Sequence, residues 1–156
     1  MPSRKAASPV AGASRAATGS TQGTPEKNMA PSQWGRRLAR LVGEKYGVTM
    51  SENRSKNEGV YRRRNIIIKC AKSPMPPVSV LTGTLERIDQ LWAVYIMPEG
   101  GAEIWVVEVS RVREHGYFTR SRTVPQRVEL FRRKIVLIGR LKGVLEREEV
   151  ESCCVP

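Results

Sequence analysis

A lysine stands inside an apolar run in the middle of the chain. Residues 66–70 read Ile-Ile-Ile-Lys-Cys, and a continuous, mostly β-branched segment of this kind predicts a strand buried on most of its surface. A cation in such a setting requires a partner, and Glu58, across the hairpin predicted from the strands at 59–64 and 65–71, is the nearest acid. Taken singly, Lys69 also fits an edge-strand lysine and Glu58 a surface carboxylate, both without a functional role.

A second candidate site combines cations with aromatic side chains. Arginines neutralise phosphates, and aromatic faces stack on exposed bases. The residues of this kind in the segment from 111 to 122 are Arg111, Arg113, His115, Tyr117, Phe118, Arg120 and Arg122. Arg62, Arg63 and Arg64 add a cationic tip to the predicted hairpin. These residues predict contacts with a nucleic acid. The alternative is a basic loop whose two aromatic side chains pack back on the core.

Other common site chemistries lack the residues they need. His115 is the only histidine, so there is almost nothing from which to build a Ser-His-Asp triad or a histidine-based metal site. Cys70 has no evident base in its sequence context, and a buried free thiol is the commoner state of such a residue. Cys153 and Cys154 are adjacent, which gives neither a disulfide framework nor a zinc spacing.

The overall charge favours polyanionic partners. Lys and Arg number 27 against 15 Asp and Glu, a formal net charge of +12 in 156 residues, which is more than solubility alone would ask for. Some arginine-rich proteins are simply basic, which is the plain alternative. No stretch approaches the ~18 to 20 consecutive apolar residues of a membrane-spanning helix, and the chain does not begin with the apolar run of a secretory signal. We therefore expect a cytoplasmic protein with no membrane partner.

Composition divides the chain into three parts. Residues 1–32 are rich in Ala, Ser, Gly, Thr and Pro with scattered cations, which predicts a disordered basic tail. Residues 33–143 alternate apolar patterns with turns and predict one compact α/β domain. Residues 144–156 carry a run of glutamates and predict an acidic, flexible C-terminal tail.

Apolar spacing within the domain predicts the individual elements. Steps of three and four residues between apolar side chains indicate helices, whereas short apolar or β-branched runs between turn residues indicate strands. Helices are predicted at 32–46, 78–88 and 124–138, and strands at 48–54, 59–64, 65–71, 91–97 and 102–109. The last two strands should form an antiparallel hairpin. Their aromatic residues, Trp92, Tyr95 and Trp105, are expected in the core.

The order of helix, three short strands, helix and strand resembles the core of the PD-(D/E)XK nuclease-like superfamily. The likeness covers roughly residues 34–97 and implies a mixed central sheet flanked by helices, that is, a restriction-endonuclease-like core. Nucleases of this kind carry an acid at the start of one strand, a D/E-x-K triplet on the next, and often a Glu in the preceding helix. Glu58, Lys69 and Glu44 fall on these three positions.

The resemblance implies magnesium chemistry at a catalytic set of Glu58, Lys69 and Glu44. Magnesium is held by one or two carboxylates plus water and phosphate oxygens, while a lysine can orient or help deprotonate the attacking water. Glu58 is the expected metal ligand. Ile67 stands at the position of the second carboxylate, so Glu44 or Glu52 would have to replace it.

Two functions follow from the sequence. The first is a nucleic-acid-binding protein with a nuclease-like fold, with DNA favoured over RNA, whose magnesium-dependent phosphodiesterase activity is either lost or rearranged. The second is a small non-enzymatic adaptor that binds a protein partner through its sheet edge and terminal helix. In that second case the strand aromatics would be interface anchors.

Overall fold

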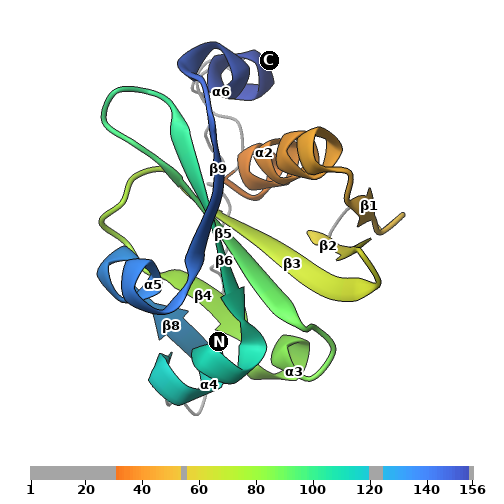
Figure 1. The fold of residues 1–156 in the computed structure, drawn as a ribbon, viewed down its shortest axis with the longest axis vertical. Coiled ribbons are helices and arrows are strands. Elements are labelled where there is room, and N and C mark those ends of the chain that lie inside the picture. The colour runs from red at the N-terminus through yellow and green to blue at the C-terminus, as the bar shows by residue number, and fades with distance from the viewer. Residues whose placement is uncertain (1–30, 54–55, 120–124, 155–156) are drawn as a thin grey trace, which may run out of the picture. The chain divides into compact units, whose positions relative to one another are not determined.

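The computed structural model describes residues 31–53, 56–119 and 125–154 (Figure 1). The helices are α2 (Pro31–Tyr46), α3 (Thr82–Leu85), α4 (Val109–His115), α5 (Arg132–Ile138) and α6 (Arg147–Cys154). The strands are β1 (Thr49–Met50), β2 (Glu58–Tyr61), β3 (Arg64–Ala71), β4 (Val78–Leu81), β5 (Gln90–Ile96), β6 (Ala102–Glu108), β7 (Tyr117–Phe118), β8 (Arg127–Leu130) and β9 (Arg140–Leu145). Across these three ranges, no helix combines the length and the apolar character needed to cross a membrane.

A mixed six-stranded sheet with the order β1-β2-β3-β5-β6-β9 forms the centre of the fold. Strands β3 and β5 run parallel, and the other neighbouring pairs are antiparallel. The side chains at 91–95 of β5 are all buried, as expected for a strand covered on both faces. The predicted α/β class, with a mixed central sheet and flanking helices, is therefore confirmed.

Helix α2 covers one face of this sheet and also contacts α6 (Figure 1). Its apolar stripe is buried, and the ring of Tyr46 at its end meets the ring of Trp92 edge-on, with a centroid separation of 6.1 Å. Successive side chains of a strand point to opposite faces. Leu91 and Ala93 therefore point away from α2.

The opposite face carries a three-stranded sheet, β4-β8-β7, together with α3, α4 and α5 (Figure 1). One apolar cluster joins this layer to the main sheet. Its buried members include Ile67, Leu91, Val107, Val80, Val112, Val128 and Ile135. Side chains that point to this face from β2 and β3 lie beside the second layer, where the candidate site is found.

Strands β2 and β3 form the predicted hairpin. Tyr61 pairs with Arg64 across a two-residue turn, and the turn residues Arg62 and Arg63 have φ values of 49° and 67°. Positive φ at both central residues is the pattern of a type I′ turn, whose twist suits a hairpin. The guanidinium of Arg62 also lies 5.1 Å from the centroid of the Tyr61 ring, a favourable cation–π distance.

The second predicted hairpin is also confirmed. Strands β5 and β6 pair antiparallel from Gln90↔Glu108 to Ile96↔Ala102. Trp92 and Tyr95 are fully buried, so these two aromatic residues belong to the core, as predicted. Trp105 is only partly buried, and its indole N–H donates to Glu103 at 2.9 Å.

The helix predicted at 78–88 is wrong. Residues Val78–Leu81 form strand β4, and only Thr82–Leu85 are helical. Val78 and Val80 are buried while Leu81 is 40% exposed, so burial alternates with a period of two. The apolar residues at helical spacing also fit a strand followed by one helical turn, and antiparallel pairing with β8 selects the strand.

The helix predicted at 124–138 is correct only in its second half. Val124 lies outside the described residues, Arg127–Leu130 form strand β8, and α5 covers Arg132–Ile138. Val128 and Leu130 are buried, again with the period of a strand. Apolar residues spaced by three and four positions therefore occur in this segment although its first half is a strand and only its second half is a helix.

The acidic segment predicted as a flexible tail has regular structure through residue 154. It completes β9 and forms α6. Val150 is buried, and the ammonium of Lys45 on α2 pairs with the Glu149 carboxylate at 3.0 Å. Glutamates in the first turn of a helix also offset the positive end of its dipole. The tail predicted at 1–32 falls outside the described residues except for its last two, which begin α2.

Candidate functional site

Glu58 and Lys69 point to the same face of the sheet. Glu58 begins β2 and stands directly opposite Ile67 of β3. Lys69 follows Ile67 by two residues, so the alternation of a strand places both side chains on one face. Ile67 belongs to the apolar cluster beneath the second layer, which shows that this face is the one turned away from α2.

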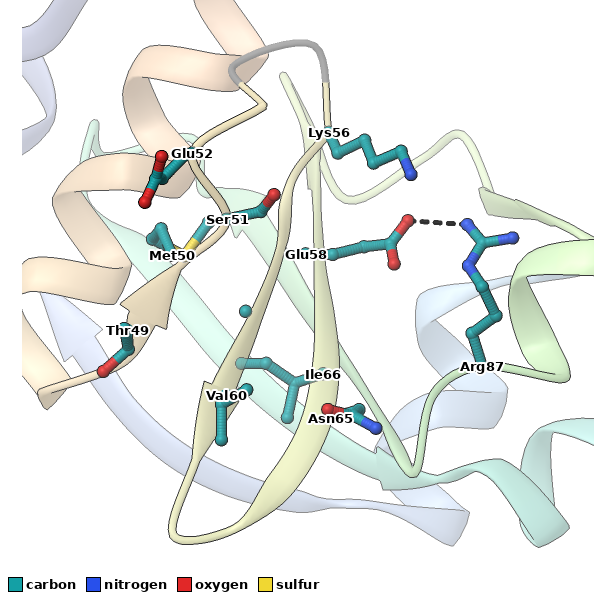
Figure 2. Close-up of a pocket in the computed structure, with 11 residues that line it drawn as sticks. Thr49, Met50, Ser51, Glu52, Lys56, Glu58, Val60, Asn65, Ile66 and Arg87 are labelled. Carbon is teal, nitrogen blue, oxygen red and sulfur yellow. Dashed lines mark hydrogen bonds and ion pairs between the residues drawn. The ribbon is translucent and has the colours of Figure 1, made fainter.

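The two predicted residues line a common cavity of about 250 Å³. Its lining residues are Lys56, Asn57, Glu58, Ile67, Lys69, Leu81, Thr84 and Arg87. A neighbouring cavity of about 490 Å³ shares three of them, Lys56, Glu58 and Arg87 (Figure 2). We call the first of these cavities the basic pocket, because three cations and one carboxylate line it.

The single carboxylate among the described residues that line the basic pocket is engaged in an ion pair. Arg87 Nη2 donates to Glu58 Oε2 at 2.8 Å (Figure 2), and the same nitrogen lies 3.4 Å from the Thr84 hydroxyl. This hydrogen bond with Glu58 raises the pKa of Arg87 above its ordinary value. The Arg87 side chain is 51% exposed and that of Glu58 20%. The guanidinium is therefore held at one edge and open to solvent elsewhere.

Lys69 does not form the ion pair predicted with Glu58, whose carboxylate pairs with Arg87 instead. Its ammonium makes no hydrogen bond or ion pair with any residue in the described ranges. Burial, followed by the positive charge of Arg127, lowers the pKa of Lys69, and the charges of Cys70 and Glu58 oppose this only partly. A partly buried cation without an acceptor is unfavourable unless an anion approaches it.

Asn57 adds a second unsatisfied polar group to the same lining. Its side-chain oxygen is buried and has no hydrogen-bond partner among the described residues. Buried polar atoms are nearly always paired in folded proteins. The Asn57 oxygen is an acceptor, so it would take a hydrogen bond from a donor and not from an anion. The groups of the basic pocket that suit an anion are its cations.

The residues of the pocket do not fit a magnesium ion. Glu58 is already paired with Arg87, and the position opposite it is occupied by Ile67, which offers no ligand. Glu52 lines only the larger cavity. Within the described part of the chain, no group of three or more His, Cys, Asp or Glu side chains is placed to hold a metal.

Glu44, the third predicted catalytic residue, does not join the other two. It is exposed on α2 and lines neither cavity. Because α2 covers the face of Trp92 while Lys69 points to the opposite face, the sheet lies between this carboxylate and the basic pocket. A shared metal site of these three residues is therefore not formed.

The predicted nucleic-acid-binding residues lie in two separate places. Arg62, Arg63 and Arg64 are exposed at the β2–β3 turn, where Arg64 also pairs with Glu108. Arg111 and Arg113 are exposed on α4, and Tyr117 is 69% exposed on β7. Arg111 lies 3.6 Å from Glu114, which partly offsets its charge. Arg120 and Arg122 lie outside the described residues.

Tyr117 and Phe118 are both exposed, with 69% and 36% of their surfaces accessible. The alternative of two aromatic side chains packed back on the core is therefore wrong for Tyr117. His115 is partly buried, and its Nε2 lies 3.3 Å from a Glu114 oxygen. An exposed aromatic ring beside arginines remains suited to stacking on a base.

Sequence reasoning missed three cations at the site: Lys56, Arg87 and Arg127. Arg87 follows α3 and lies in the segment that was predicted as a continuous helix. Its proximity to Glu58 could therefore not be predicted from the spacing of apolar residues. Arg127 stands on β8 opposite Leu81, in the half of the predicted terminal helix that is a strand. The only available signal was the general excess of positive charge.

Another partly buried lysine, Lys142, lies on the α2 face. Its ammonium donates to the Tyr61 hydroxyl at 2.6 Å and lies 4.4 Å from the centroid of that ring. It is also 5.6 Å from the ring centroids of Tyr46 and Trp92. We call these four residues the aromatic cluster. Its lysine is satisfied by the fold.

Comparisons of the chain with models of protein families, with curated proteins and with solved structures found no match.

Proposed function

We propose that the protein binds nucleic acid, with DNA favoured over RNA, and that the basic pocket receives a backbone phosphate. The observation that carries this proposal is Lys69, a partly buried ammonium without a hydrogen-bond acceptor among the described residues. Lys56 and Arg87 line the same pocket against one carboxylate. Phosphate oxygens are the acceptors that such a group of cations suits, and backbone phosphates dominate nucleic-acid affinity.

The arrangement of elements supports a nuclease-like core as part of this proposal. Helix α2 precedes three strands, β1, β2 and β3, which are neighbours in the sheet. After β4 and α3, strand β5 returns parallel to β3. This order resembles the one inferred from the sequence, but the helix expected before β5 is replaced by strand β4 and the single helical turn α3. Glu58 and Lys69 also share a face, as that resemblance implies.

A salt-titrated binding assay tests the proposed function. We expect fluorescence anisotropy with labelled duplex DNA, single-stranded DNA and RNA to show saturable binding. If about three phosphates are neutralised, the logarithm of the binding constant should fall with a slope of about −3 against the logarithm of salt concentration. Absent or salt-insensitive binding would contradict the proposal.

Cleavage is a separate matter, because the paired Glu58 and the apolar Ile67 favour binding without catalysis. We expect the intact protein to leave DNA and RNA uncut in the presence of magnesium. If the protein does cut, Lys69→Ala and Glu58→Ala should each abolish cutting at protein concentrations that still saturate the DNA, which would restore the rearranged phosphodiesterase. Gel analysis of end-labelled substrates distinguishes these two outcomes.

A second candidate function, the protein-binding adaptor, is favoured by the exposed apolar residues near β9. This strand forms one edge of the main sheet, and its Leu141 and Val144 are 50% and 48% exposed. Leu137 on the adjoining α5 is 76% exposed. Exposed apolar groups beside an open edge suit strand addition. Leu141→Asp should abolish a partner complex detected by light scattering while leaving DNA binding unchanged.

A further inference from the structure

The Glu58–Arg87 ion pair stands where the superfamily resemblance places a metal. Glu58 is the carboxylate expected to hold magnesium, and Arg87 Nη2 lies 2.8 Å from its Oε2 (Figure 2). Ile67, opposite Glu58, supplies an apolar wall where a second ligand would be needed. The guanidinium therefore already provides the positive charge beside this carboxylate.

A guanidinium held in this way retains donors for an anion. Arginine has five N–H donors in a planar fork that matches the oxygens of a phosphate. In Arg87, the contacts with Glu58 and Thr84 both use Nη2. Within the described part of the chain, the contact of Nη1 is with the Gly83 carbonyl, at 3.5 Å. Half of the side chain is exposed. The remaining edge is free to face a ligand.

The positive charge of the basic pocket is also sufficient to neutralise a phosphodiester without a metal ion. Among the described residues that line the pocket, Lys56, Lys69 and Arg87 supply three positive charges against the single negative charge of Glu58, which leaves a surplus of two. Figure 2 shows Lys56 and Arg87 pointing toward the Glu58 carboxylate from different sides. A phosphodiester group carries one negative charge, so the surplus suffices to neutralise it.

We infer that Arg87, held by Glu58, takes the place of a divalent metal, and that the basic pocket binds a phosphodiester group directly through Arg87 and Lys69. This inference rests on the proposed function. Glu58 is then a positioning residue that orients the guanidinium, not a metal ligand. The expected ligand is the backbone of a nucleic acid, and its binding requires no magnesium.

Anisotropy titrations of a labelled DNA duplex at constant ionic strength test this inference, in EDTA and in magnesium. The wild type should bind without magnesium, and each variant is compared with the wild type in the same buffer because magnesium also competes for the phosphates. Arg87→Ala should lose about tenfold in EDTA, the lower range for a charge-assisted hydrogen bond. Magnesium should restore part of that loss, because the variant releases Glu58 from its ion pair and one carboxylate together with phosphate and water oxygens can then hold the ion.

Two further variants complete the design. The double variant Glu58→Gln with Arg87→Ala should lose the same affinity without recovery in magnesium. Arg147→Ala is the matched control, because it also removes one exposed arginine from an ion pair, that with Glu151 at 3.0 Å on α6. It should bind like wild type in both buffers. Thermal unfolding checks that every variant is folded.

Three results would overturn the inference while leaving the proposed function intact. These are wild-type binding that requires magnesium, an Arg87→Ala variant that binds like the wild type, and a loss that magnesium does not reverse although Glu58 is present. Absence of DNA binding by the wild type would instead contradict the proposed function itself.

Discussion

Two partly buried lysines lie on opposite faces of the same sheet and differ in what surrounds them. Lys142 donates a hydrogen bond to Tyr61 and lies over three aromatic rings. Lys69 stands between apolar strand residues and has no hydrogen-bond acceptor among the residues described. The fold compensates the positive charge of Lys142, whereas the described residues do not compensate that of Lys69.

The pKa directions agree with this difference. The hydrogen bond from Lys142 is the largest cause that lowers the pKa of Tyr61, so the lysine stabilises a negative charge within the aromatic cluster. Burial is the largest cause that lowers the pKa of Lys69, so its charge is disfavoured by its own surroundings. We conclude that Lys142 serves stability, whereas Lys69 suits the binding of an external anion.

The largest expected effect is on DNA binding. Lys69→Ala should weaken binding about tenfold, because one charge-assisted contact with a phosphate is lost, whereas Lys142→Ala should leave affinity within about twofold, since that charge is already compensated. Anisotropy titrations at one salt concentration measure both. Equal losses from the two variants would mean that only total charge matters and would remove the distinction between the lysines.

The next largest effect is on folding stability, and here the variant of Lys142 should show the loss. Lys142→Ala should lower the free energy of unfolding by about 1 kcal/mol, because a partly exposed charge-assisted hydrogen bond and cation–π contacts disappear. Lys134 on α5 is exposed, so Lys134→Ala is the control and should change stability by less than about 0.5 kcal/mol. Urea denaturation measures both. An unchanged stability in Lys142→Ala would show that the aromatic cluster does not depend on its lysine.

A smaller stability effect is expected at Lys69. Lys69→Met keeps the length of the side chain and removes the unpartnered charge, so it should raise the free energy of unfolding by about 0.5 kcal/mol at neutral pH. The pKa of Lys69 is lower in the folded state, so the unfolded chain binds more protons between that value and 10.5, and wild-type stability rises with pH in this window.

The advantage of Lys69→Met should therefore shrink as the pH rises toward 10.5. Urea denaturation across this pH range, with Lys134→Met as the control, measures the trend. A variant that is less stable than the wild type at neutral pH would show that Lys69 has a compensating partner within the folded chain.

The sequence predicted the class of fold. It also placed Glu58 and Lys69 on neighbouring strands of one hairpin, although the ion pair expected between them is not formed. A β-branched run and a turn fix which residues face each other across β2 and β3, so two residues eleven positions apart could be placed. The buried Trp92 and Tyr95 followed from the same reasoning.

The rest of the site depends on contacts that spacing does not record. Arg87, which pairs with Glu58, follows a segment in which Val78–Leu81 form a strand that pairs with β8. The apolar pattern of both of these strands fitted a helix equally well. Lys142 meets Tyr61 across the sheet from a strand 81 residues away. Such long-range partners determine whether the ammonium group of a lysine has a hydrogen-bond acceptor within the fold, and therefore whether it is available to an external anion.

The smallest expected effect is a shift in the titration of one tyrosine. Lys142→Ala should raise the pKa of Tyr61 toward its ordinary value of 10.0, because the hydrogen bond and the nearby charge that favour tyrosinate are both removed. Ultraviolet absorbance titration, with Tyr61→Phe used to subtract the other tyrosines, measures the change. Lys69→Ala should leave this titration unaltered, because Lys69 faces the other side of the sheet. If Lys69→Ala shifted Tyr61 as much as Lys142→Ala does, the two lysines would share one electrostatic environment, and their separation into a structural and a ligand-binding cation would fail.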